Sequence, residues 1–105
     1  MSQFAANIEA LLPKSENLVR LDLFEGDNTV SASIENIEGS KASVAIYYQL
    51  AIDFGGIGPS AAEKGLELYA EYTEEAKANP GQHPNIDRFF DIIENQRYFA
   101  VRAVS

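Results

Sequence analysis

The sequence predicts an α+β domain: a three-stranded antiparallel sheet, made of a β-hairpin and a C-terminal strand, with about four helices in the order α-β-β-α-α-α-β. Three observations predict this class. The N-terminal and central segments have helical spacing of apolar residues, residues 18–35 alternate between apolar and polar, and a β-prone run ends the chain. Since 105 residues is the size of one domain, we expect residues 1–105 to form a single globular unit with the helices on one face of the sheet.

The first element is a short amphipathic helix. Its apolar residues occupy one helical stripe, namely Phe4, Ile8, Leu11 and Leu12. Ser2 can cap the start of this helix, and Pro13 is expected to stop it.

A β-hairpin should follow. Val19, Leu21 and Leu23 alternate with polar residues, and so do Val30, Ala32 and Ile34. Because the apolar positions are odd in one strand and even in the other, the loop must have an even number of residues. A Gly26-Asp27 turn would pair Leu23 with Val30; an Asp27-Asn28 turn or a four-residue loop over 25–28 satisfies the same parity.

Two helices are expected in the middle of the chain. Residues 41–54 are apolar on nearly every side, which predicts a buried helix ending at Gly55, although a strand is the alternative. Ser60 and Glu63 match a capping box and predict one long helix over 60–79. In that helix Gly65 is unfavourable unless a neighbouring element packs closely against it.

The C-terminal part should contain one more helix and the last strand. Pro84 or Asn85 opens the helix, whose core stripe would be Ile86, Phe89, Phe90 and Ile93. In the run over 98–104, we expect Phe99, Val101 and Ala103 to point inward and Arg102 outward.

Composition excludes several classes of function. The 16 acidic and 8 basic residues give a net charge of −8, which repels nucleic acids and anionic membranes. With no Cys and one His, we expect no metal site and no cofactor. The absence of Cys fits a reducing compartment, and no membrane span or secretory signal is evident, so the sequence predicts a cytoplasmic protein. The excess negative charge lies in residues 1–38 and 60–79.

Two surfaces are candidates for binding a protein partner or a second copy of the chain. Four glutamates spaced four apart would form a ridge along the 60–79 helix, namely Glu63, Glu67, Glu71 and Glu75. Such a ridge is usually just a solvated face. The second surface is the outer face of the sheet, with Arg20 and Arg102.

His83 with Asp87 is the candidate for chemistry or ligand binding. Imidazole can act as an acid or a base near neutral pH, and a carboxylate four residues later could orient it at the start of a helix. The alternative is structural, with His83 in a turn and Asp87 complementing the helix dipole. Anion binding at the glycine-rich loop 55–60 is weaker, because the phosphate-loop spacing is missing.

Two segments carry a resemblance to a known family. The run over residues 65–73, GLELYAEYT, and the run over 79–89, NPGQHPNIDRF, resemble a family of small acidic proteobacterial proteins described only as a domain of unknown function. The resemblance implies no activity and no catalytic residue. From the residues, we favour a non-catalytic interaction or regulatory module; a small enzyme or ligand-binding domain using His83 and Asp87 is the alternative.

Overall fold

The structure, a computed structural model, describes residues 2–105 and has the expected α+β architecture. Its elements in chain order are α1 (Gln3–Ser15), β1 (Arg20–Phe24), β2 (Val30–Glu35), α2 (Lys41–Phe54), α3 (Pro59–Tyr69), α4 (Glu71–Ala78), α5 (Pro84–Asn95) and β3 (Ala100–Val104). Within residues 2–105 there are thus five helices, one more than the approximate number expected.

The three strands form an antiparallel sheet in the order β2-β1-β3. β1 pairs Leu21 with Ile34 and Leu23 with Ala32, and a bulge follows at Phe24. The apolar residues therefore pair with the expected parity, but Leu23 does not pair with Val30. The prediction of a loop with an even number of residues was also wrong, because the loop over residues 25–29 has five. The bulge adds one residue to β2, so the pairs on the far side of the bulge from the loop are those that an Asp27-Asn28 turn requires.

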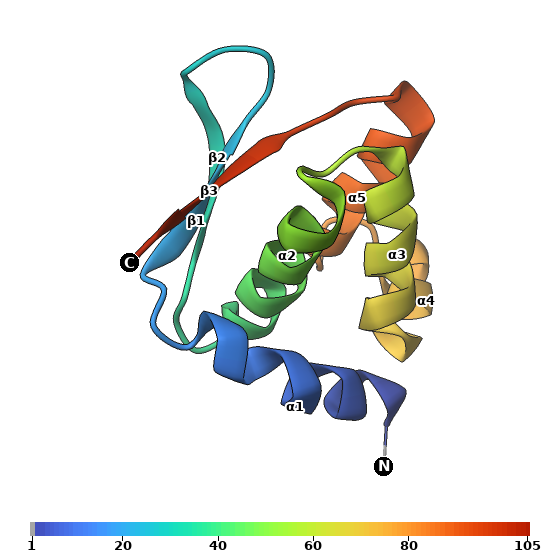
Figure 1. Cartoon of the computed structure of the whole chain (residues 1–105). Coiled ribbons are helices and arrows are strands. Elements are labelled where there is room, and N and C mark those ends of the chain that lie inside the picture. Colours follow the sequence, from blue (N-terminus) through green and yellow to red (C-terminus); the bar gives the residue numbers. More distant parts are fainter. Residues whose placement is uncertain (1) are drawn as a thin grey trace.

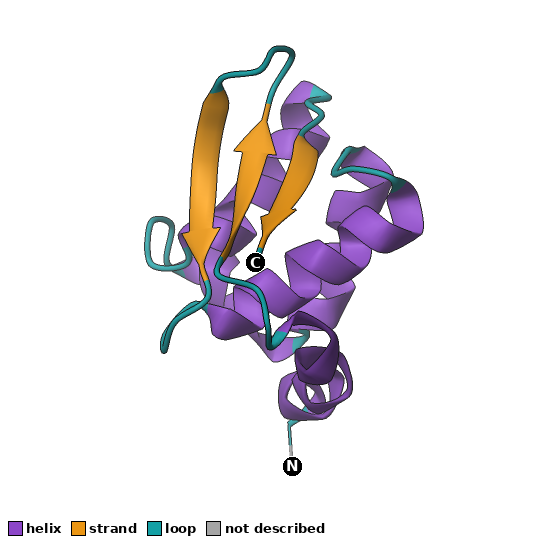
Figure 2. Cartoon of the chain, turned by 60° about the vertical axis from the view of Figure 1, so that its left-hand side comes forward, coloured by secondary structure: helices purple, strands orange, loops and turns teal. Residues whose placement is uncertain are grey.

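The helices lie on one side of the sheet (Figures 1 and 2). α2 contacts all three strands, while α3 and α5 pack against each other beyond it. α1 lies across one end of the helical layer and contacts α2, α3 and α4. In the described part of the chain, no helix covers the opposite face of the sheet (Figure 2).

α2 is the central helix of the core. It buries Val44, Ile46, Tyr47 and Leu50 and ends at Gly55, whose φ of 78° is the left-handed conformation typical of a helix C-cap. The helical assignment of residues 41–54 is thus confirmed. Gly65 of α3 sits against α5, because a Cβ added there would lie 2.4 Å from Cε2 of Phe89. The close packing that the sequence required for this glycine is present.

The single helix expected over 60–79 is wrong. The chain breaks at Ala70, with φ 54° and ψ −120°, between α3 and α4. No Gly or Pro marks this position, so local sequence does not signal the break. The capping box is also wrong, because Gly58 is the N-cap of α3, Pro59 follows it, and no side chain caps the helix.

Other boundaries and faces differ in detail. The Ser2 side chain caps α1 by accepting a hydrogen bond from the Ala5 N–H, as expected, but Pro13 lies inside the helix. α5 buries Ile92 fully, whereas Phe90 and Ile93 are half-buried. Three apolar strand residues placed inward are exposed, since they lie at strand ends or on an edge that the helices do not cover, namely Val19, Val30 and Ala103.

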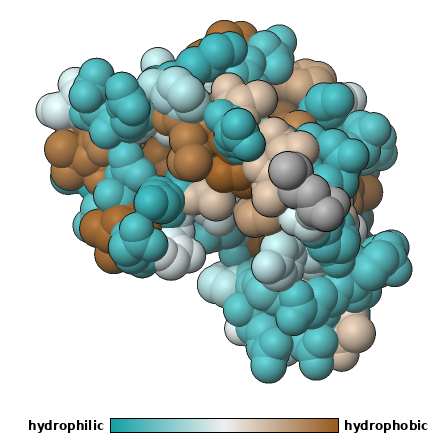
Figure 3. Space-filling view, turned by 90° about the horizontal axis from the view of Figure 1, so that it is seen from below, coloured by the Kyte–Doolittle hydropathy of each residue, from teal (hydrophilic) through white to brown (hydrophobic). Residues whose placement is uncertain are grey.

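Within residues 2–105, no helix combines the length and apolar character needed to cross a membrane. Seen from the α1 end, hydrophobic residues form several patches in the upper and left-hand parts of the view, with hydrophilic residues between them (Figure 3).

Candidate functional site

A hollow beside His83 brings together residues from most of the helices. A cavity of about 260 Å³ and an adjoining one of about 140 Å³ share five lining residues, namely Gly39, Ser43, Tyr69, His83 and Ile86. These residues come from the β2–α2 turn, α2, α3 and the start of α5, and Phe4 of α1 and Tyr72 of α4 close the smaller part. We call these two joined cavities the His83 hollow.

The polar wall of the hollow is a pair of hydroxyl groups. Ser43 Oγ and Tyr69 Oη are 2.5 Å apart, and either can donate. Burial raises the pKa of Tyr69 well above its ordinary value, so the phenol stays protonated. Because two hydroxyl hydrogens share one hydrogen bond, one O–H of the pair remains free to donate to a ligand.

His83 contributes a buried nitrogen whose hydrogen-bonding capacity is unused. Its Nε2 is inaccessible to solvent and forms no hydrogen bond in the described part of the chain. It lies 3.5 Å from Oε2 of Glu75 on α4, an ion-pair distance if the imidazole is protonated. The edge of the imidazole also meets the ring of Tyr72, with centroids 5.9 Å apart.

His83 and Asp87 have different neighbours. Asp87 accepts a hydrogen bond from the Gly81 N–H at 2.9 Å, which fixes the turn before α5. Within residues 2–105, no hydrogen bond or ion pair joins it to His83. The partner of His83 is instead Glu75, a residue that the sequence pattern grouped with the acidic ridge.

The acidic ridge does not exist as one row, because the break at Ala70 separates its two halves. Glu71 accepts a hydrogen bond from the Phe4 N–H at 3.1 Å. Its own backbone N–H, the Ser2 hydroxyl and the Phe4 N–H together lower its pKa. Since Glu71 binds the start of α1 and Glu75 faces His83, only Glu63 and Glu67 remain as free exposed glutamates of the original four.

The outer face of the sheet carries an ion network around Asp22. The carboxylate accepts hydrogen bonds from Ser33 Oγ at 2.8 Å and Arg20 Nε at 2.9 Å, and Arg102 Nη2 lies at 3.2 Å. Asp22 is only 2% accessible, because these side chains cover it. Hydrogen bonds from Ser33, Arg20 and Arg102 lower its pKa to about 2. Arg20 and Arg102 therefore stabilise the sheet internally.

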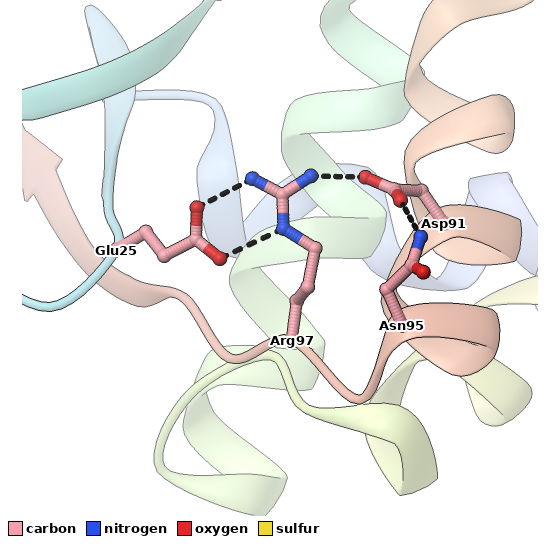
Figure 4. A network of polar contacts seen from close by, with 4 residues as sticks. All are labelled: Glu25, Asp91, Asn95 and Arg97. Atoms are coloured by element: carbon pink, nitrogen blue, oxygen red, sulfur yellow. Dashed lines mark hydrogen bonds and ion pairs between the residues drawn. The ribbon is translucent and has the colours of Figure 1, made fainter.

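A second polar network joins the hairpin to α5 (Figure 4). Arg97 donates to both carboxylate oxygens of Glu25, in the β1–β2 loop, and to Asp91 of α5, which Asn95 also contacts. The hydrogen bonds from Arg97 lower the pKa of Glu25, and the pKa of Arg97 is raised in return. The sequence pattern gave no sign of this network, since its partners are far apart in the chain.

A cleft of about 390 Å³ lies beside this network, with two acidic and two basic residues among those that line it, namely Asp87, Asp91, Arg88 and Arg97. Arg97 is engaged by two carboxylates, and Arg88 donates to Tyr47 Oη at 3.1 Å and to Asn85 Oδ1 at 2.8 Å. Because these groups are already bonded within the protein, the cleft offers a ligand fewer free polar groups than the His83 hollow does.

The glycine-rich loop 55–60 has a structural explanation. Gly55 caps α2, and Ile57 exchanges two backbone hydrogen bonds with Phe99, at 2.8 and 3.0 Å, which extends the edge of the sheet next to β3. Nothing at this loop points to an anion. Likewise, residues 2–105 contain no group of three His, Cys, Asp or Glu side chains placed to hold a metal ion.

Sequence reasoning singled out His83 but missed its surroundings. Ser43 is a polar residue within the apolar run of α2, and that contrast was the available signal. Tyr69 is buried, and the rings of Tyr69 and Tyr72 both line the hollow.

Comparison with known proteins gives one match. A family model described as "Uncharacterized protein conserved in bacteria (DUF2322)" matches residues 4–103. Searches of curated proteins and of solved structures found no match. The matched range includes both segments on which the resemblance depends, and these segments supply Tyr69, Tyr72 and His83. Since nearly the whole chain is matched, the protein belongs to this bacterial family.

Proposed function

We propose that this chain is a small-ligand-binding domain whose binding site is the His83 hollow. The observation that carries the proposal is the buried, unbonded Nε2 of His83 at the wall of a cavity that also presents the Ser43 and Tyr69 hydroxyls. Pockets that join several elements and combine apolar walls with a few convergent polar groups are typical binding sites.

The hydrogen-bond balance supports a ligand at this place. Buried polar atoms in folded proteins almost always have a partner, and an unpaired one costs about 1–3 kcal/mol. Among the buried side-chain atoms of residues 2–105, His83 Nε2 lacks a hydrogen-bond partner. A ligand that reorients the imidazole or completes its contact with Glu75 would recover this cost, and this favours a site kept for binding.

Binding is favoured over catalysis. A serine nucleophile needs a base within hydrogen-bond reach, but Ser43 is bonded to the Tyr69 hydroxyl. The pKa of Tyr69 is raised, so this phenol is a poor base at neutral pH. The hollow can therefore hold and orient a molecule, and none of these groups is activated to transform it.

Nuclear magnetic resonance on the full chain tests this proposal. A panel of small metabolites of positive, negative and zero charge is added to the ¹⁵N-labelled protein. We expect at least one compound to shift the backbone signals of the shared lining residues, namely Gly39, Ser43, Tyr69, His83 and Ile86. If no compound shifts them, or if every shift maps to the cleft at Arg97, the proposal is wrong.

The test variant is Tyr69→Phe, which removes one hydroxyl of the pair. Its matched control is Tyr48→Phe, which removes a tyrosine hydroxyl outside the hollow. Binding should weaken in the first variant and stay unchanged in the second.

A second candidate function is self-association through the free edge of β3. Because neighbouring residues of a strand point their backbone groups to opposite sides, and Phe99 pairs outward with Ile57, Val101 and Ala103 also present theirs at the outer edge. Residues 80–105 contain three acidic and three basic residues, so two copies can approach here without the repulsion of the acidic regions. A second copy of the chain is the proposed occupant.

Sedimentation velocity of the wild type and of Ala103→Lys tests this edge. A dimer that dissociates in the variant supports pairing at β3. A wild type that is monomeric at all concentrations removes the candidate.

A cytoplasmic location is also part of the proposal. The chain has no Cys, so it cannot form the disulfides that stabilise many small proteins in oxidising compartments. Cell fractionation of the tagged protein, with known cytoplasmic and envelope proteins as markers, checks it.

A further inference from the structure

The smaller part of the His83 hollow is walled by aromatic rings. Phe4 lies parallel to Tyr69, with centroids 6.0 Å apart, and meets Tyr72 edge-on at 4.7 Å. Tyr72 in turn meets the imidazole of His83. These four rings, together with Ala42, Ser43 and the two residues Gly39 and Ile86, line a cavity of about 140 Å³. Electron-rich ring faces attract cations at distances up to about 6 Å.

Carboxylates contact two of the residues that carry these rings, whereas Arg88 acts on Tyr69 from outside the hollow. Glu75 lies beside His83, and Glu71 accepts a hydrogen bond from the Phe4 N–H. Two of the four ring-bearing residues are therefore each contacted by a carboxylate. Among the described residues, no Lys or Arg lines either part of the hollow. The net charge of −8 adds a long-range field that attracts cations and repels anions.

The size and polarity of the hollow limit the ligand further. A cavity of about 150 Å³ takes up a benzene molecule, so the aromatic part has room for a compact head group such as trimethylammonium. The adjoining part of about 260 Å³ presents the Ser43 and Tyr69 hydroxyls, which can bond a hydroxyl or carbonyl group a few atoms away.

We propose that the His83 hollow binds a small organic cation, an alkylammonium or quaternary ammonium ion, with its charged head against Phe4, Tyr69 and Tyr72 and its polar tail toward Ser43. This inference rests on the proposed function and specifies its ligand class. The rings stabilise the head group, and the nearby carboxylates select for positive charge.

The experiment compares three probes of similar size on the ¹⁵N-labelled full chain: choline, its uncharged isostere 3,3-dimethylbutan-1-ol, and the anion 3,3-dimethylbutanoate. We expect choline to shift the signals of the hollow and to bind about 5- to 30-fold more tightly than the isostere, since a cation near desolvated rings gains about 1–2 kcal/mol. The anion should bind more weakly than both.

Two pairs of variants separate the aromatic and the electrostatic parts of the proposal. Tyr72→Leu and Glu75→Gln should each weaken choline binding by several-fold. Their matched controls are Tyr98→Leu, an exposed tyrosine that does not line the hollow, and Glu63→Gln, an exposed glutamate of α3. Neither control should change the affinity.

The outcomes distinguish the two proposals. Equal binding of choline and its isostere, or tighter binding of the anion, overturns the cation inference and leaves a ligand site in place. If none of the three probes, nor any member of the wider panel, shifts the hollow, both proposals fail. Choline shifts that map outside the hollow, or that persist unchanged in Tyr72→Leu, also contradict the inference.

Discussion

Nε2 of His83 lies 3.5 Å from Oε2 of Glu75, so the start of α5 faces α4 through a pair of titratable groups. The break at Ala70 makes this approach possible, because it turns α4 away from the line of α3. Neither residue forms a hydrogen bond with the other in the described structure, and the imidazole borders a cavity. The pair therefore borders the proposed binding site.

Replacing His83 with Leu should not destabilise the protein. The buried Nε2 contributes no hydrogen bond, so its loss removes an unpaired polar atom that costs about 1–3 kcal/mol. We expect the free energy of unfolding in urea to stay the same or to rise by up to that amount, while ligand binding is lost. In contrast, Ile86→Ala at the fully buried neighbouring position should cost about 2–5 kcal/mol. If His83→Leu lowered the free energy of unfolding as much as Ile86→Ala does, His83 would be a residue that stabilises the fold.

Ser43 and Tyr69 should be coupled. Ser43→Ala removes the partner of a buried phenol, which costs about 1–3 kcal/mol. Tyr69→Phe should cost about 1 kcal/mol, and the double variant less than the sum of the two. Urea unfolding of the four proteins measures the coupling. Strict additivity would show that the hydroxyl pair contributes nothing.

Gly65→Ala should destabilise the protein, even though alanine favours helix by about 1 kcal/mol. The added Cβ would lie 2.4 Å from Cε2 and 2.5 Å from Cζ of Phe89, which is fully buried and has no room to move aside. Such overpacking costs about 1–3 kcal/mol. Thermal unfolding checks this, with Lys64→Ala on the exposed side of α3 as the control, which should stay within about 0.5 kcal/mol of the wild type.

Asp22 should stabilise the sheet in a pH-dependent way. Its pKa is lowered from 3.8 to about 2, so its charged form stabilises the folded state above about pH 4, and this contribution disappears as the pH falls toward 2. Asp22→Asn should therefore melt at a lower temperature than the wild type at pH 6, and the difference should shrink between pH 4 and pH 2. Glu94→Gln, at an exposed position, serves as the control. A difference between wild type and Asp22→Asn that stays constant down to pH 2 would contradict the assignment.

The contact between Glu25 and Arg97 should be sensitive to salt. Both side chains are about one third exposed, so added ions screen their attraction. A double-mutant cycle with Glu25→Gln and Arg97→Gln should give a favourable coupling energy at low ionic strength and a smaller one in about 1 M NaCl. A coupling that is absent at low salt would show that this network does not join the hairpin to α5.

Periodicity predicted most of the fold. The alternation over 18–35 placed β1 and β2 correctly, and the apolar residues of 41–54 correctly predicted α2, because one buried face or a fully buried helix leaves a direct record in the sequence. The register of the hairpin was not predictable beyond its parity, since a bulge at Phe24 shifts the pairing without changing the alternation.

The site was predictable only in part. As the one histidine of the chain, His83 was a visible candidate, but its partner depends on the break at Ala70, where neither Gly nor Pro signals an interruption. The same break removed the acidic ridge. Phe4 and Tyr72 meet only through the packing of α1 against α4, a contact between residues far apart in the chain that no local pattern encodes.

The most direct test of the account is a measurement of nuclear Overhauser effects between the protein and choline, or whichever compound of the panel binds most tightly. The account predicts contacts from the ligand's methyl or methylene protons to the ring protons of Phe4, Tyr69 and Tyr72. Contacts only to residues of the cleft at Arg97, or the absence of any bound compound, would contradict it.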